Sequence, residues 1–177
     1  IAATGNTPSN TTNVESYNGS AWTEVANVNT GKFYRGNNGT ATAGLLIGGA
    51  PSTGDVEEWN GTNWTETANY PGNVTGLIQL GTQTAAFCIG GDVPPYTTAT
   101  NTYNGSSFTS STAINTARSN GIGSGSTTAA VIAGGTTPGA TGATELWNGS
   151  SWTEVNDLNT ARDLLAGSGS SSTNSLA

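Results

Sequence analysis

A short segment recurs four times along the chain, and this repetition constrains the fold more than any other feature. Each copy has an aromatic residue, an Asn-Gly pair, two further residues, and then a second aromatic residue followed by a hydroxyl residue. The Asn-Gly pairs occupy 18–19, 60–61, 104–105 and 148–149, so successive copies lie 42, 44 and 44 residues apart. Eight aromatic residues occupy the two aromatic positions: Tyr17, Trp22, Trp59, Trp64, Tyr103, Phe108, Trp147 and Trp152. Because aromatic residues are only 7% of the chain, composition alone does not explain this alignment.

Two further landmarks keep the same spacing. A double glycine ends an apolar run in three places: Gly48-Gly49, Gly90-Gly91 and Gly134-Gly135. A weaker landmark is a basic residue ten positions after the second aromatic residue, at Lys32, Arg118 and Arg162, whereas Val74 holds that position in the second repeat. The whole chain, residues 1–177, is therefore interpreted as one repeat domain with a unit of about 44 residues.

One unit predicts four short antiparallel strands. Residues 164–166 are a candidate first strand, 128–133 a second strand ending at a double glycine, 144–147 a third and 152–155 a fourth. The Asn-Gly pair between the third and fourth strands is a strong hairpin signal, since both residue types tolerate the positive φ of tight turns. No stretch shows a helical apolar period. Four strands per unit with regular turns predict an all-β fold, a β-propeller in which each repeat is a four-stranded blade.

The unit resembles a kelch repeat. That family has a double glycine ending the second strand, an aromatic residue in the third strand and another that opens the fourth, an order seen from Gly48-Gly49 to Trp59 and Trp64. The unit is shorter than the roughly 50 residues of typical kelch repeats. Its richness in Asn, Gly, Ser and Thr, with strings such as Asn159-Thr160-Ala161-Arg162, resembles kelch-like repeats of environmental bacteriophages. Kelch propellers also occur as parts of oxidases and lyases, so the resemblance implies that an accessory domain of a larger enzyme is one possible role.

The two ends of the sequence fit each other. The chain stops within the second strand of its fourth repeat, and its first residues look like the end of that same strand. Three arrangements are compatible with this pattern: a window from a longer array, a closed four-bladed ring whose termini share one blade, or a filament subunit that completes its neighbour's blade. The strands at Ala177 and Ile1 are expected to belong to one blade, because an exposed half-blade would be a reactive sheet edge.

Charge excludes two classes of partner. The formal net charge is −7 with only four basic residues, so the chain lacks the basic stripe that nucleic acid requires, and an anionic membrane would repel it. No apolar run reaches the length of a membrane span. The remaining partners are a protein or a glycan, together with further copies of the chain or a longer array.

The sequence offers little catalytic chemistry. It contains no His, so Ser-His-Asp and Cys-His arrangements are impossible, no metal or cofactor is expected, and we predict that the chain is not an enzyme. Glu57 and Glu58 are neighbours in a strand and point to opposite faces, so they cannot converge on one bond. An acid recurs in register at Glu15, at Glu58 or Glu57, and at Glu145, which indicates a structural role. Cys88 is expected to be a buried core residue.

The aromatic positions have two interpretations. Repetition in register favours packing between blades, because each sheet must bury a face on the next. Exposed rings that stack on sugars are the alternative.

Partner binding is predicted at the connections after the double glycines. These connections differ in every repeat, whereas the Asn-Gly turns barely vary, and variable loops on a rigid scaffold suit recognition. Asp55, Asp92 and Tyr96 are the candidate ligand-binding residues. Merely solvated loops, or loops in lateral contacts, are the alternative.

Eight sequons mark candidate N-glycosylation sites, although a chain so rich in Asn, Ser and Thr produces such triplets by accident. They begin at Asn10, Asn18, Asn38, Asn60, Asn63, Asn73, Asn104 and Asn148.

The sequence therefore favours a non-catalytic structural or adhesive β-propeller module of an extracellular assembly, such as a phage fibre, surface appendage or filament, that presents variable loops to a glycan or protein. Such a module would lie in the extracellular space or on a virion surface. The alternative is an accessory propeller domain of a larger enzyme, such as a carbohydrate-active oxidase or lyase.

Overall fold

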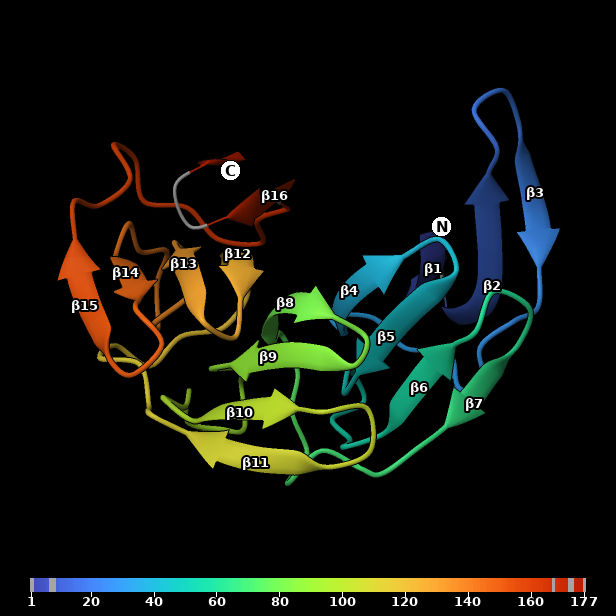
Figure 1. Cartoon of the computed structure of the whole chain (residues 1–177), viewed down its shortest axis with the longest axis horizontal. Coiled ribbons are helices and arrows are strands. Elements are labelled where there is room, and N and C mark those ends of the chain that lie inside the picture. The colour runs from blue at the N-terminus through green and yellow to red at the C-terminus, as the bar shows by residue number, and fades with distance from the viewer. Residues whose placement is uncertain (1, 7–8, 167, 172–173, 177) are drawn as a thin grey trace.

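The chain is built of antiparallel sheets arranged as blades around a shared axis (Figure 1). The computed structural model describes residues 2–6, 9–166, 168–171 and 174–176. Strands are the only regular elements among these residues. No helix long and apolar enough to span a membrane occurs in the part of the chain that the structure describes. The all-β propeller architecture predicted from the repeat is therefore confirmed.

Three blades have four strands each, ordered in space as in the sequence. Blade 2 comprises β4 (Gly36–Thr40), β5 (Ala43–Ile47), β6 (Val56–Trp59) and β7 (Trp64–Glu66). Blade 3 comprises β8 (Ile78–Thr82), β9 (Ala85–Ile89), β10 (Thr100–Tyr103) and β11 (Phe108–Ser111). Blade 4 comprises β12 (Ile122–Ser126), β13 (Ala129–Ala133), β14 (Thr144–Trp147) and β15 (Trp152–Val155). The first strand of each blade lies nearest the axis (Figure 1).

Two smaller sheets lie at the ends of the arc. Blade 1 has three strands, β1 (Ala2–Asn6), β2 (Asn10–Tyr17) and β3 (Trp22–Val25), and β1 pairs with β2 as the second strand of a complete blade pairs with the third. The last sheet has two strands, β16 (Ser168–Ser171) and β17 (Asn174–Leu176). β4, β8, β12 and β16 contact one another in succession around the axis. An opening separates β16 from blade 1 (Figure 1).

The Asn-Gly pairs form the turns between the third and fourth strands, as predicted. Trp59 is paired with Trp64 across one turn, and Trp147 with Trp152 across another. The glycines of these turns have φ between +91° and +100°. In each turn the Asn Oδ1 accepts hydrogen bonds from the backbone N–H groups two and three positions later. In the second repeat, for example, the backbone nitrogens of Thr62 and Asn63 each lie 2.9 Å from Asn60 Oδ1. Side chain and glycine together close the hairpin.

The double glycine ends the second strand and joins neighbouring blades. The backbone N–H of the second glycine donates to the backbone carbonyl of the residue at the weaker landmark. The nitrogen-to-oxygen distances are 2.9 Å from Gly49 to Val74, 2.8 Å from Gly91 to Arg118 and 2.9 Å from Gly135 to Arg162. Because this hydrogen bond uses only backbone atoms, a non-basic residue such as Val74 can also occupy the position. The same bond runs from Gly5 to Lys32, at 3.2 Å, so blade 1 keeps the pattern although Thr4 replaces the first glycine.

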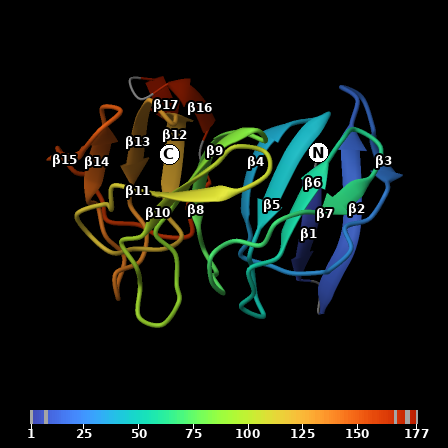
Figure 2. The ribbon, with the colours of Figure 1, turned by 60° about the horizontal axis from the view of Figure 1, so that its bottom comes forward.

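The two kinds of connection lie at opposite ends of the blades. An ideal Cβ on Gly61, Gly105 or Gly149 would lie near the turn between the first and second strands, at Thr42, Thr84 and Thr128 respectively. Both turns therefore share one end, the Asn-Gly end. The long connection after β9 projects at the other end, the double-glycine end, opposite the β2–β3 hairpin (Figure 2).

Blades 2 to 4 bury their aromatic pairs against the preceding blade. Trp59 and Trp64 pack with Val14 and Val28 of the first repeat. Trp147 and Trp152 pack around Phe87 of blade 3, with ring centroids 5.4 and 5.7 Å away. The third interface joins Tyr103 and Phe108 to the apolar residues of blade 2. Inter-blade packing is thus confirmed for these three blades.

One predicted strand is wrong, and one prediction lies outside the described residues. Residues 164–166 precede β16 and form no strand, because Leu164 has φ +52°. It occupies the position of Tyr34, Gly76 and Asn120, whose φ values are also positive and which lead into the inner strands. The proposed joining of Ile1 and Ala177 in one blade concerns two residues outside those that the structure describes.

Candidate functional site

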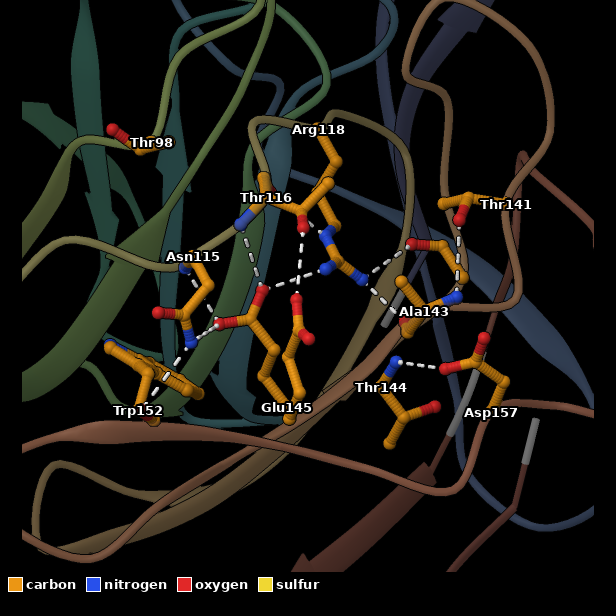
Figure 3. Close-up of polar contacts among 12 residues, drawn as sticks. Thr98, Asn115, Thr116, Arg118, Thr141, Ala143, Thr144, Glu145, Trp152 and Asp157 are labelled. Carbon is orange, nitrogen blue, oxygen red and sulfur yellow. Dashed lines mark hydrogen bonds and ion pairs between the residues drawn. The ribbon is translucent and has the colours of Figure 1, made fainter.

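A polar cluster locks blade 4 to the preceding connection (Figure 3). The Glu145 carboxylate on β14 forms an ion pair of 2.7 Å with Arg118 and accepts bonds of 2.7 and 2.8 Å from the backbone and side-chain nitrogens of Asn115. Thr116 donates its backbone N–H at 3.2 Å. Arg118 also donates to the carbonyls of Thr116, Gly134 and Ala143. Both charged side chains are 0% exposed, so all of these hydrogen bonds are made to other groups of the protein.

A similar lock occurs in blade 2, although its arginine, Arg35, lies three positions after Lys32, which holds the repeat position of Arg118. Glu57 pairs with Arg35 at 2.8 Å and accepts bonds of 2.7 and 3.0 Å from Asn29. The register assigns the repeated acid to Glu57, which lies opposite Glu66 as Glu145 lies opposite Glu154. The structural role expected for the repeated acid fits both buried pairs. Burial lowers the pKa of Arg118, while Glu145 beside it opposes that shift.

Blade 3 replaces the lock with neutral groups. Asn101 occupies the acid's position and donates to the Tyr70 hydroxyl at 2.8 Å. Burial raises the pKa of Tyr70 to about 12 and that of the nearby Cys88 to about 12. Cys88 is 0% exposed, which confirms that it is a core residue. At neutral pH its thiol stays protonated and is a poor nucleophile.

One cavity lies on the axis, where the connections enter the inner strands. Its volume is about 410 Å³. The lining comes from four successive repeats: Tyr34, Arg35, Asn37, Gly76, Leu77, Gln79, Asn120, Gly121, Ile122, Gly123, Leu164, Leu165 and Ala166. A series of backbone bonds holds its rim, from the Gly76 nitrogen to the Tyr34 carbonyl at 2.9 Å and from the Asn120 nitrogen to the Gly76 carbonyl at 2.8 Å. The cavity therefore opens at the double-glycine end.

Polar groups in this cavity have unused hydrogen-bonding capacity. Arg35 has a side chain only 2% exposed, and its Nη1 bonds to Glu57 and to the Thr30 carbonyl. Within the described structure its Nε and Nη2 atoms have no partner, and neither does the Gln79 Oε1. Tyr34 is 51% exposed on the rim. Buried donors and an acceptor beside an exposed ring form a site that fits a polyhydroxylated ligand.

The three predicted ligand-binding residues lie around this end of the molecule, outside the cavity lining. Asp55 forms an ion pair of 3.1 Å with the buried Lys32, so its carboxylate is already engaged. Asp92 is bridged to Thr75, the neighbour of the cavity residue Gly76, and also to Tyr96. Asp92 and Tyr96 are both half-buried. The structure thus brings Asp92 and Tyr96 together beside Thr75, and their role in binding stays a prediction.

Sequence reasoning missed the cavity residues because no local motif marks them. Tyr34, Gly76 and Asn120 each lie two positions after the weaker landmark, and this regular spacing was the available signal. Six of the eight predicted sequon asparagines are exposed, and Asn10 and Asn38 are half-buried. Glycosylation at these positions stays a prediction. No group of three or more metal-ligating side chains comes together among the described residues.

The architecture and its repeated interfaces define a β-propeller-like protein of tandem blades. Neither a protein-family model nor a curated protein matches the sequence. Among solved structures, the chain is similar to one entitled "Structure of YjhT", with a TM-score of 0.72 and 12% sequence identity. The likeness covers 86% of this chain and 64% of that chain, so the chain spans less than two thirds of the YjhT length. At this identity the likeness concerns the fold.

Proposed function

We propose that the chain is a non-catalytic adhesive β-propeller module that binds a saccharide at the double-glycine end. The observation that carries this proposal is the axial cavity, in which unpartnered Arg35 donors and amide side chains lie beside the exposed Tyr34 ring. Sugars present many hydroxyl groups and one apolar ring face, which hydrogen-bonding side chains and an aromatic ring complement. Glu57 already balances the charge of the Arg35 guanidinium, so the unpartnered Nε and Nη2 donors suit the hydroxyl groups of a neutral saccharide.

The arrangement of loops also supports a binding module. The connections after the double glycines differ in every repeat, and backbone bridges such as Thr53 to Val74 and Ser119 to Thr136 anchor them to the linkers between blades. Variable loops are thereby held on a regular scaffold. The net charge of −7, the sequons and the resemblance to kelch-type phage repeats support an extracellular or virion location.

Screening the folded chain against neutral and acidic glycans tests this proposal. Binding to a neutral glycan is expected, and Tyr34→Ala or Asn120→Ala should weaken it about tenfold, the equivalent of ~1.4 kcal/mol. The double variant with Asp92→Ala and Tyr96→Ala tests whether the adjacent loop contributes to glycan binding. Ser106→Ala, at an exposed Asn-Gly turn, is the matched control and should bind normally. Absence of binding, or a loss produced only by the control, contradicts the proposal.

A further inference from the structure

The arginines of the two locks pair with equivalent acids but use their guanidinium groups differently. Arg118 lies at the weaker landmark, and its Nε, Nη1 and Nη2 atoms donate to Glu145 and to three backbone carbonyls. Arg35 lies three positions after the weaker landmark, next to β4, and only its Nη1 atom has partners. Its Nε and Nη2 atoms are buried and have no partner in the described structure. The guanidinium edge that carries these two donors is therefore free.

This free edge lies inside the molecule. The Arg35 side chain is only 2% exposed, so other residues of the chain cover it, and Glu57 balances its charge at 2.8 Å. Arg35 also belongs to the lining of the axial cavity. Because a buried donor without a partner is destabilising, such donors are rare in folded proteins and indicate that a further group is bound.

Gln79 on β8 supplies an acceptor in the same part of the cavity. An ideal Cβ on Gly36, the residue after Arg35, would lie 2.5 Å from Gln79 Oε1. Neighbouring bonds fix the orientation of this amide. Asn38 Nδ2 donates to two backbone carbonyls of β8, at 3.3 and 3.1 Å, so Asn38 Oδ1 is the atom that accepts from Gln79 Nε2. Gln79 Oε1 is thereby left as a buried acceptor that has no partner among the described residues.

Two adjacent donors and one acceptor discriminate between classes of ligand. A carboxylate or sulfate has only acceptor atoms, so it would leave Gln79 Oε1 unsatisfied. It would also bring a buried charge to Arg35, which Glu57 already neutralises. Two hydroxyl groups on neighbouring carbons place two acceptor oxygens side by side, and each hydroxyl also has a proton to donate. The polar groups of the cavity therefore complement a vicinal diol.

We propose that the axial cavity recognises a neutral saccharide through two hydroxyl groups on neighbouring ring carbons. Arg35 Nε and Nη2 donate to the two hydroxyl oxygens, and one of the hydroxyls donates to Gln79 Oε1. The ring of Tyr34, which is 51% exposed at the rim, stacks on the apolar face of the sugar. The cavity volume of about 410 Å³ is in the range of small-molecule sites. This inference rests on the proposed function and specifies its ligand class.

Calorimetric titration of the full chain with the methyl glycosides of glucose, mannose and galactose tests this ligand class. At least one glycoside is expected to bind. In its series of single-deoxy derivatives, removal of either of two neighbouring hydroxyls should weaken binding about tenfold, because a buried donor then loses its partner. The methyl glycoside of glucuronic acid, which carries a carboxylate, should bind no more tightly than that of glucose.

Arg35→Lys tests the two-donor edge, because it keeps a cation beside Glu57 and removes the edge. The variant should bind the parent glycoside and its deoxy derivatives about equally. Arg118→Lys is the matched control: it makes the same change in the lock of blade 4, outside the cavity lining, and should keep the discrimination. Gln79→Met removes the acceptor. Its control is Gln83→Met, which alters a glutamine that donates to two carbonyls away from the cavity.

The outcomes separate this inference from the proposed function. Circular dichroism and thermal unfolding verify that each variant is folded, and the Gln79 variant provides the test if Arg35→Lys is unfolded. Glycoside binding that depends on Tyr34 but is insensitive to every single deoxygenation would support the proposed function and overturn the assigned ligand class. Tighter binding of the glucuronide, or equal loss of discrimination in Arg35→Lys and Arg118→Lys, also overturns it. Absence of binding to any of the glycosides overturns it as well, and a glycan screen without binding removes the proposed function too.

Discussion

Glu145 shows how one side chain can join two blades. Its carboxylate accepts bonds from two backbone nitrogens and two side chains of a segment about 30 residues earlier in the sequence. Burial of an ion pair is favourable only when the remaining hydrogen-bonding capacity is also satisfied, and here the arginine donates to three carbonyls as well. Blade 3 shows the alternative, because Asn101 and Tyr70 fill the same place without charge.

The first prediction concerns this lock. Glu145→Ala leaves Arg118 buried without a counterion, and it should lower the free energy of unfolding by about 3–5 kcal/mol. Urea denaturation followed by tryptophan fluorescence measures the change. Glu154→Ala, on the exposed strand opposite, is the control and should cost less than about 1 kcal/mol. Equal losses in the two variants contradict a structural role for the ion pair.

At the scale of the element, the sequence predicted what local signals encode. The second, third and fourth strands and the Asn-Gly turns follow from apolar runs and turn residues that lie close together. The inner strands were misplaced because they are rich in small and polar residues, as in β4 and β12, whereas the apolar Leu164 and Leu165 belong to the preceding connection. The repeat spacing already favours Glu57 over Glu58, because Glu57 lies two positions before Trp59 as Glu145 lies two before Trp147, and the register of β6 with β7 agrees.

The second prediction concerns the double glycine at the end of β13. Gly135 has φ +105°, and a Cβ there would lie 2.5 Å from the Ser119 carbonyl oxygen and 3.0 Å from the Gly121 nitrogen. Both are backbone atoms of the neighbouring connection, so Gly135→Ala should destabilise the chain by at least ~2 kcal/mol. Gly139→Ala is the control, since no atom lies within 4 Å of its added Cβ. Thermal unfolding compares them, and similar midpoints contradict the assigned close approach.

At the scale of the whole molecule, each blade contacts its neighbours in the sequence, so stability is distributed over repeated interfaces. The axial cavity belongs to this scale, because Tyr34, Gly76, Asn120 and Leu164 meet only when four repeats are arranged around one axis. A single repeat contains one of these residues, which is why local motifs do not reveal the site. The repeat spacing identifies Tyr34, Gly76, Asn120 and Leu164 as equivalent positions. Predicting the cavity from them also requires knowing that equivalent positions face a common axis.

The last prediction compares equivalent tryptophans in two blades. Trp64 is 8% exposed beneath blade 1, so Trp64→Ala should lower the free energy of unfolding by about 3–5 kcal/mol. Trp22 occupies the same position in blade 1 but is 55% exposed, so Trp22→Ala should cost less than about 1 kcal/mol in dilute solution. Urea denaturation followed by tryptophan fluorescence measures both changes. Equal losses in the two variants would contradict the packing of Trp64 beneath blade 1.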